Sequence, residues 1–232
     1  MMFMESNAAA LIAQARRSAW PPAGSTAVEE AIETIAAGGM VIVIDDEGRE
    51  NEGDLIAAAD LAAPEALAFM VNYTTGIVCV AIDDARADAL ALPRMVERND
   101  DPLATAFTVT CDATDVGTGV SAAERARTIR LLGDPSAGPA DLRRPGHVFP
   151  LRARRGGVLA RMGHTEAAYD LARLARRSPA GMLAELVNPD GTMMRGPDIA
   201  GFAARHGLQV LRIDALIAWR VSREVEWLAR SA

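Results

Sequence analysis

Short apolar runs alternate with amphipathic segments along the chain after residue 25. The apolar runs are rich in β-branched residues, which is typical of buried strands. The segments between them place apolar residues at helical spacing; Ser121 with Glu124 forms the capping box of one predicted helix, and Thr165 is the predicted N-cap of another. Strands are predicted at 40–44, 77–82, 105–111, 181–187 and 208–213, with a further strand near 158, and helices at 28–37, 64–70, 83–92, 122–131, 167–172, 198–205 and from 214.

The order of these elements predicts an α+β fold, a three-layer α-β-α sandwich around a mixed β-sheet. Residues 26–232 are enough for a single domain with a sizeable core, and residues 1–25 predict a flexible N-terminal extension. Segment 135–145, which is rich in Gly and Pro, predicts a surface loop. Because only 4% of the residues are aromatic, the core must consist largely of small and branched aliphatic side chains.

The composition excludes several classes of function. A formal net charge of −7 disfavours nucleic-acid binding, which needs a basic surface. All 24 basic residues are arginine, so mechanisms that need a lysine amine, such as Schiff-base catalysis, are excluded. The sequence contains no apolar stretch long enough for a membrane span, no secretory signal and no disulfide framework, since it has only two cysteines. We therefore expect a cytoplasmic protein without a membrane partner.

The most charged stretch, residues 45–54, directly follows the first predicted strand and holds six carboxylates and one guanidinium. Two like charges about 4 Å apart repel by roughly 4 kcal/mol at an effective dielectric near 20. Such a loop either spreads into solvent or binds a cation. Gly48 and Gly53 allow sharp bends, and the buried strand delivers the loop to a sheet edge, so the pattern favours a structured cation site.

A second candidate site is the turn from Arg161 to Thr165, which precedes a predicted helix. Free backbone N–H groups at a helix N-terminus, together with an arginine, are suited to bind phosphate. The alternative is an ordinary capped helix. His164 favours the site, because an imidazole beside an anion-binding turn can also bind a divalent ion, with a carboxylate from the acidic loop as a further ligand.

Two further residues are in unusual settings. His147 lies between glycine and proline breaks and is expected to be buried, whereas His206 is expected to be exposed and inert. Glu185 interrupts an apolar strand, where a lone carboxylate costs several kcal/mol unless it is paired or protonated. It is therefore either salt-bridged to an arginine or catalytic, and we favour catalysis.

Five motifs occur in an order that resembles the 3,4-dihydroxy-2-butanone-4-phosphate synthases of riboflavin biosynthesis: residues 45–54, 105–109, 118–126, 145–151 and 163–167. The resemblance spans about residues 27–220. It implies a lyase that converts D-ribulose 5-phosphate to L-3,4-dihydroxy-2-butanone 4-phosphate and formate through a metal-stabilised enediolate. It also implies Mg²⁺ or Mn²⁺, two ions per active site, and a homodimer. The two cysteines suggest a monofunctional form, because the fused form carries a Cys-ligated zinc domain.

The resemblance also implies roles for individual residues. Glu50 and His164 hold the metal. Arg49, Glu50, Asp54, Thr118, Arg161, Met162, Gly163, His164, Thr165 and Glu185 contact the substrate, and His147, Glu185, Asp45, Glu52 and Cys79 are catalytic.

Three other interpretations remain open on sequence. A metal-dependent pentose-phosphate isomerase or epimerase would use the same turn and the same enediolate but release no formate. A sensor of phosphorylated metabolites, or an RNA-modification domain of similar architecture, would have no such turnover, and the latter would need a basic surface. An inactive paralogue would keep the motifs without the activity.

Overall fold

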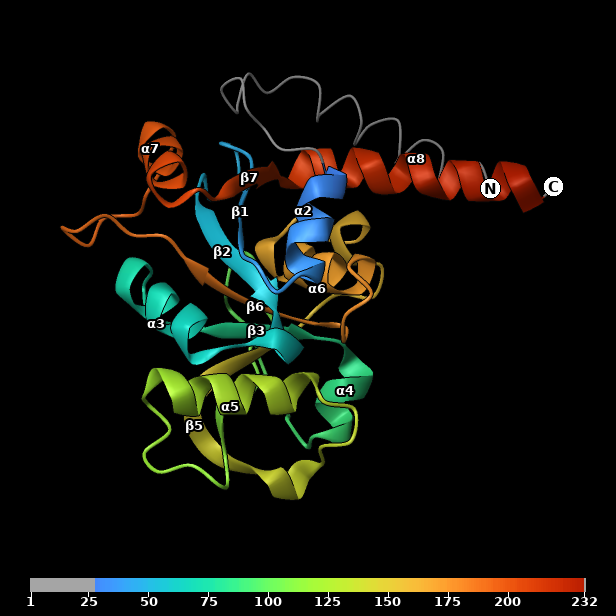
Figure 1. Cartoon of the computed structure of the whole chain (residues 1–232). Coiled ribbons are helices and arrows are strands. Elements are labelled where there is room, and N and C mark those ends of the chain that lie inside the picture. Colours follow the sequence, from blue (N-terminus) through green and yellow to red (C-terminus); the bar gives the residue numbers. More distant parts are fainter. Residues whose placement is uncertain (1–27, 232) are drawn as a thin grey trace.

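The computed structural model describes residues 28–231, with side chains through residue 223, so the predicted extension 1–25 lies outside the described residues. A seven-stranded mixed sheet forms the centre, in the order β4-β5-β3-β6-β2-β1-β7 (Figure 1). The strands are β1 Val41–Ile44, β2 Gly53–Ala58, β3 Cys79–Ile82, β4 Cys111–Ala113, β5 Leu142–Arg152, β6 Ala180–Glu185 and β7 Gln209–Arg212. The helices are α2 Val28–Ala36, α3 Pro64–Tyr73, α4 Asp84–Ala89, α5 Ala122–Gly133, α6 His164–Leu174, α7 Pro197–His206 and α8 Ile213–Ser231, with 3-10 turns η1 Ala59–Leu61, η2 Pro139–Asp141 and η3 Gly157–Leu159.

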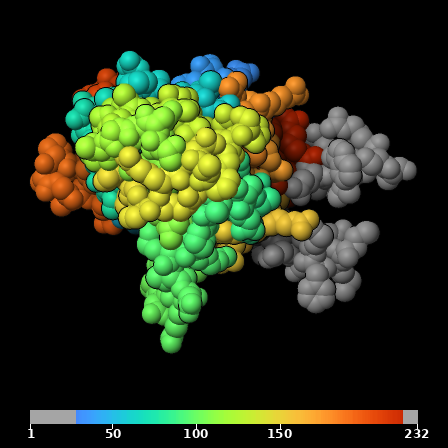
Figure 2. Space-filling model, turned by 90° about the horizontal axis from the view of Figure 1, so that it is seen from below, coloured from blue at the N-terminus to red at the C-terminus, as the bar shows by residue number. Residues whose placement is uncertain are grey.

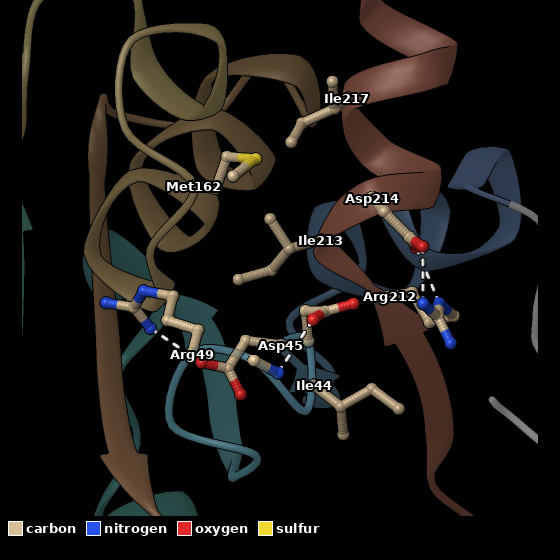
Figure 3. A pocket seen from close by; sticks show the side chains of 10 residues that line it. Ile44, Asp45, Arg49, Met162, Arg212, Ile213, Asp214 and Ile217 are labelled. Atoms are coloured by element: carbon tan, nitrogen blue, oxygen red, sulfur yellow. Dashed lines mark hydrogen bonds and ion pairs between the residues drawn. The ribbon is translucent and has the colours of Figure 1, made fainter. Parts of the chain in front are cut away.

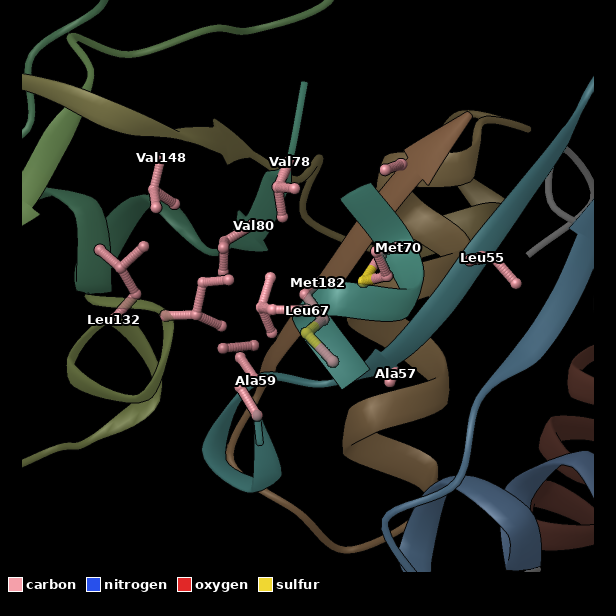
Figure 4. Packing of buried hydrophobic residues seen from close by; sticks show 14 of the residues in the cluster. Leu55, Ala57, Ala59, Leu67, Met70, Val78, Val80, Leu132, Val148 and Met182 are labelled. Carbon is pink, nitrogen blue, oxygen red and sulfur yellow. The ribbon is translucent and has the colours of Figure 1, made fainter. Parts of the chain in front are cut away.

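Helices cover both faces of the sheet, which confirms the predicted three-layer sandwich (Figure 1). Side chains alternate along β1, so Ile42 and Ile44 join the apolar cluster under α3, α5 and α7. Val41 and Val43 join the second cluster, under α2, α6 and α8. Figure 4 shows the first cluster, in which residues of α3 pack against strands β3 and β6. Full burial of each such aliphatic side chain contributes about 1.5–3 kcal/mol.

Strand β2 was not predicted from the sequence, because its first two residues belong to the acidic stretch. All six residues of β2 are buried, and β2 pairs antiparallel with β1, so residues 45–52 connect the two strands of a hairpin. Gly53 is required at this point, since a Cβ there would lie 2.8 Å from Cδ1 of Ile199. The hairpin carries Asp54 into the sheet, where a loop would have left it exposed.

Three other predicted elements are wrong. Segment 105–110 forms only isolated bridges through Phe107 and Thr108, and the regular strand β4 begins at Cys111. Segment 135–145, predicted to be a loop, contains η2 and the start of β5. The strand predicted near residue 158 is the turn η3, because Gly156 and Gly157 have φ angles of +102° and +61°, which end an extended chain.

Two features project from this body. Helix α8 extends beyond the sheet (Figure 1), and the exposed segment 93–104 protrudes on another side (Figure 2). Within residues 28–231, no helix combines the length and the apolar composition that crossing a membrane requires.

Candidate active site

Asp45 organises the acidic loop. Its carboxylate Oδ1 accepts a hydrogen bond from Glu52 N at 2.9 Å, and Oδ2 accepts from Glu50 N at 3.1 Å and from Arg49 Nη1 at 2.8 Å. The side chain of Asp45 is buried. Because one carboxylate holds the backbone on both sides of the turn, the loop has a defined structure rather than a solvated one.

The loop brings two carboxylates to the first turn of α6, where His164 lies. One ligand atom each from Asp45, Glu50 and His164 lies within 4.8 Å of the others. The Nδ1 atom of His164 is 3.5 Å from Glu50 Oε2 and 3.7 Å from Oδ1 of Asp54. We call Asp45, Glu50, Asp54 and His164 the anionic cluster. Buried atoms Asp54 Oδ1 and His164 Nε2 have no hydrogen-bond partner among the described residues. Unused buried donors and acceptors beside oxygen and imidazole ligands fit a divalent ion.

The electrostatics of this cluster favour a positive charge. Burial opposes the cationic form of His164, but the charge of Asp54 and the hydrogen bond to Glu50 outweigh it and raise the imidazole pKa to about 9. For Glu50, contacts with His164 and Arg49 outweigh burial and lower the pKa. Burial and the charge of Glu185 raise the pKa of Asp54 to about 7, with His164 opposing. A proton on His164 or a metal ion would each supply the missing positive charge.

Glu185 joins the same end of the sheet through strand pairing. It lies directly opposite Asp54 in the β2–β6 ladder. Its Oε2 accepts a hydrogen bond from Thr75 Oγ1 at 2.6 Å, and no ion pair to it occurs among the side chains described through residue 223. The salt-bridge alternative for Glu185 therefore has no support in the structure, and the side chain stays available for chemistry.

Cys79 and Glu52 border this cluster. Burial, together with the charges of Glu185 and Asp54, raises the pKa of the Cys79 thiol well above 9.0, so the group stays protonated. Burial and the charge of Glu50 raise the pKa of Glu52, whose Oε1 lies 3.3 Å from Nη2 of Arg195. The raised pKa of Glu52 favours proton exchange by this carboxylate, whereas the thiol of Cys79 keeps its proton.

The N-terminus of α6 differs in detail from its prediction. The helix begins at His164 with Gly163 as the N-cap, so Thr165 is the second helical residue and the prediction that it caps the helix is wrong. Gly163 N–H donates to the carbonyl of Arg161 at 2.9 Å. This tight turn precedes the helix, which therefore begins one residue before Thr165. The backbone N–H groups of the first turn remain at the site, as an anion cradle requires.

Arg161 is held in place beside this cradle. Its Nη1 contacts Oε2 of Glu166 at 2.6 Å, and its Nη2 donates to the Leu103 carbonyl of the protruding segment at 3.1 Å. Glu166 is only 1% exposed. A Cβ at Gly163 would lie 2.3 Å from Arg161 Nη1, so glycine is needed for this contact. A guanidinium fixed in this way has less side-chain entropy to lose when it binds an anion.

His147 and Thr118 are not in contact with the anionic cluster within the described residues. The His147 side chain is 48% exposed, so the prediction of a buried histidine is wrong, and its Nδ1 lies 2.9 Å from Asp112 Oδ2. Its strand, β5, is separated from β6 by β3 in the sheet. Thr118 is exposed and its hydroxyl contacts Glu124 at 3.4 Å. His206, predicted to be inert, packs its ring against Phe202.

A cavity of about 280 Å³ lies between the acidic loop and the start of α8. Figure 3 shows Met162 and Ile217 across this cavity from Asp45 and Arg49. Met162 lines the cavity together with Ile213, Asp214 and Ile217 of α8, and its contact with substrate stays a prediction.

Three side chains at these sites were not found from the sequence. Thr75 and Glu166 gave no local signal, since each contacts its partner only after folding. Asp112 could have been found by the argument applied to Glu185, because it is a carboxylate next to an apolar run.

Known proteins resemble the chain in sequence. Residues 29–219 match the family model described as 3,4-dihydroxy-2-butanone 4-phosphate synthase. The chain is 57% identical over 207 residues to the riboflavin biosynthesis protein RibBA of Salinispora arenicola, with 88% of this chain and 49% of the relative covered. It therefore spans about half the length of this relative. It is also 53% identical over 200 residues to the 3,4-dihydroxy-2-butanone 4-phosphate synthase of Agrobacterium fabrum, with 86% of this chain and 94% of the relative covered.

A solved structure has the same fold. It is a crystal structure of 3,4-dihydroxy-2-butanone 4-phosphate synthase in complex with two magnesium ions. The TM-score is 0.83 at 43% sequence identity, covering 86% of this chain and 98% of that chain. The likeness therefore extends over nearly all of the described sheet and helices.

Proposed function

The chain belongs to the 3,4-dihydroxy-2-butanone 4-phosphate synthase family, and from this membership we propose that it converts D-ribulose 5-phosphate to L-3,4-dihydroxy-2-butanone 4-phosphate and formate in riboflavin biosynthesis. The observation that carries the proposal is the anionic cluster at the free N-terminus of α6. It combines a cation site with an anion site within one turn of helix. A sugar phosphate whose carbonyl and hydroxyl oxygens bind a metal needs that combination.

Glu50 and His164 would hold Mg²⁺ or Mn²⁺, with Asp45 within reach of the same ion. Bound there, the ion supplies Lewis acidity toward substrate oxygens. The proposal includes two ions per site, because the related crystal structure is a complex with two magnesium ions. The buried, unpartnered atoms Asp54 Oδ1 and His164 Nε2 support a site that takes further ligands.

The carboxylates and His147 would move the protons. The reaction removes a proton beside a carbonyl, expels water, shifts the carbon skeleton, takes up a water again and releases formate, so several proton transfers are needed. Glu185 and Asp54 are adjacent on paired strands, and the pKa of Asp54 near 7 suits a group that both accepts and returns a proton. Asp45 would hold the loop, Glu52 would assist proton exchange, and the protonated Cys79 would line the pocket.

The substrate phosphate would bind the first turn of α6. Arg161 offers a fixed guanidinium, and the backbone from Gly163 to Thr165 offers N–H groups. Arg49 and Asp54 would contact the sugar, with Met162 at the edge of the site and Thr118 as a further contact. We also propose a homodimer. A cytoplasmic location stays a prediction.

Incubation with ribulose 5-phosphate labelled with carbon-13, and with magnesium, tests this function by NMR of the products. We expect equal amounts of labelled formate and a four-carbon ketose phosphate. A pentose-phosphate isomerase or epimerase would yield a five-carbon product and no formate, and a sensor or an inactive paralogue would leave the substrate unchanged. Glu50→Gln protein purified in parallel controls for a contaminating enzyme, and formate from both preparations would contradict the proposal.

A further inference from the structure

One carboxylate makes two hydrogen bonds to the same histidine. Asp112 Oδ1 accepts from the backbone N–H of His147 at 2.9 Å, and Asp112 Oδ2 lies 2.9 Å from Nδ1 of the ring. Asp112 is 2% exposed, whereas the ring itself is half exposed. The carboxylate therefore reaches the ring from inside the protein, and the opposite ring atom, Nε2, is on the far side.

The backbone around Asp112 is built for this contact. The β4–β5 pairing shifts register between Cys111 and Asp112, and such irregularities re-aim a side chain. A Cβ at Gly119, whose φ is +82°, would lie 2.3 Å from Asp112 Oδ2, and a Cβ at Gly146 would lie 2.1 Å from the carbonyl carbon of Cys111. Gly119 thus lets its turn approach the carboxylate, and Gly146 lets β5 approach the backbone next to Asp112.

A nearby arginine favours the charged form of the Asp112 carboxylate. Nη2 of Arg143 lies 3.7 Å from Asp112 Oδ2, and Arg143 is otherwise bound to the carbonyls of Val116 and Gly117. A carboxylate can only accept hydrogen bonds, so the histidine nitrogen that faces it must carry the hydrogen. Nδ1 is then the protonated nitrogen of the neutral ring, and Nε2 keeps its lone pair.

We propose that Asp112 is a positioning residue that fixes His147 in the Nδ1–H tautomer, with a basic Nε2 available to the substrate. The proposal rests on the proposed function, in which His147 transfers protons. An aspartate plays the same part for the histidine of serine proteases, where exchange for asparagine leaves the geometry intact but lowers kcat by about 10⁴ through the wrong tautomer. Asp112 itself is not expected to touch the substrate.

The tautomer of the parent protein can be measured directly. In protein with ¹⁵N-labelled histidine and magnesium present, two-bond ¹H–¹⁵N correlation spectra at alkaline pH distinguish a protonated from an unprotonated ring nitrogen, and His147→Gln identifies the signals. We expect hydrogen on Nδ1 and none on Nε2. Hydrogen on Nε2 would overturn the proposal, and this result does not depend on whether any Asp112 variant folds.

Asp112→Asn tests the consequence. Its amide oxygen must keep facing the backbone N–H of His147, which can only donate, so its NH₂ group faces Nδ1 and selects the Nε2–H tautomer. We expect the ring hydrogen to move to Nε2 and kcat to fall at least 100-fold with KM within threefold. Asp115→Asn makes the same charge change at an exposed residue of the next turn, which pairs with Arg127, and should leave kcat within twofold.

Combining Asp112→Asn with His147→Gln separates action through the histidine from a general structural effect. If Asp112 acts through His147, the double variant is no slower than His147→Gln alone. A further loss of tenfold or more, or a moved tautomer with unchanged kcat, would overturn the proposal. In either case the parent still releases formate, whereas failure of the proposed function would appear as no formate from the parent.

Discussion

Helix α6 has two charged clusters six residues apart, each centred on a buried side chain, and they are composed in opposite ways. At its first turn, the anionic cluster places three carboxylates around His164. Further along, Asp170 lies 2.7 Å from Nη1 of Arg220 and 3.6 Å from Nη2 of Arg173, and it accepts from the Val158 N–H at 2.8 Å. We call Asp170, Arg173 and Arg220 the ion-pair cluster.

The ion-pair cluster fastens elements of the fold to one another. Asp170 is fully buried, and burial raises its pKa although Val158 N–H and Arg220 oppose the shift. Its partners come from η3 and α8, so this carboxylate fastens two elements to α6. The anionic cluster instead places three carboxylates around one imidazole, so it carries an excess of negative charge that a bound cation would offset. Substitutions in the two clusters should therefore have opposite effects on activity and stability.

The greatest loss of activity is expected at Glu50. Glu50→Gln removes a proposed metal ligand and its charge, so formate production should fall below detection while the melting temperature stays near that of the parent. The same holds for His164→Ala, and EDTA should abolish turnover of the parent. Glu47→Gln, an exposed acid in the same loop, is the matched control and should keep full activity. Turnover in metal-free buffer would remove the metal from the mechanism.

Glu185 should behave as a catalytic residue although it lies in a sheet. Glu185→Gln keeps the shape and can still accept from Thr75, but it cannot transfer a proton, and general acid–base catalysis contributes about 10²–10⁴-fold. We expect kcat to fall at least 100-fold with an unchanged melting temperature. Both are measured on the same preparation, and a kcat within threefold of the parent would assign Glu185 to the fold.

The ion-pair cluster should show the reverse. Asp170→Ala takes the carboxylate from a buried guanidinium and should cost about 3 kcal/mol of the free energy of unfolding, or roughly 6–12 °C in melting temperature. Below the transition, kcat should stay within threefold. Asp190→Ala, an exposed site, controls for loss of an acid. An unchanged melting temperature, or a loss of activity in a fully folded variant, would contradict the assignment of the ion-pair cluster to stability and not to activity.

Arg161 should combine both kinds of effect. It forms an ion pair with the buried Glu166, and it is also proposed to bind the substrate phosphate. Arg161→Ala should raise KM for ribulose 5-phosphate at least tenfold, which is about 1.4 kcal/mol, and inorganic phosphate should compete with substrate in the parent. Arg155→Ala removes an exposed arginine nearby and should leave KM unchanged. An unaltered KM in Arg161→Ala would place the phosphate elsewhere.

A pH-dependent effect on stability concerns Asp54 in metal-free protein. Its pKa rises from 3.8 to about 7 on folding, so its stabilising contribution is complete below pH 3.8 and is lost as the pH rises through about 7. In EDTA, the parent should therefore lose about 2–3 kcal/mol more stability than Asp54→Asn between about pH 5 and about pH 8.5. Thermal unfolding of both proteins at both pH values measures this. An equal loss of stability in the two proteins would mean that burial does not raise the pKa of Asp54.

The elements that were predicted correctly from the sequence are those set by contacts between neighbouring residues. Helix α5 and its capping box agree with prediction, because Ser121 and Glu124 bond within one turn. Strand β1 and the acidic loop were also recognised from neighbouring residues. The order and bounds of most elements follow in the same way from short-range spacing.

What the sequence did not predict depends on partners far along the chain. Asp54 pairs with Val43 within the hairpin, but its place beside Glu185, 131 positions later, is set by the pairing of β2 with β6. His147 is exposed and bound to Asp112 because a register shift turns that carboxylate toward it. Contacts of this kind are set by register, and no window of neighbouring residues contains them.

The strand order of the sheet also constrains how the chain can be synthesised. The β1–β2 hairpin is local and apolar, but its neighbours in the finished sheet are β6, which begins at residue 180, and β7, which begins at residue 209. At translation rates of about 5–20 residues per second, the hairpin waits roughly 6–24 seconds after its own synthesis before β6 exists. During that interval both of its edges can pair with another nascent chain. Production of this protein should therefore depend on chaperones that shield emerging strands, and slower translation should lower its soluble yield.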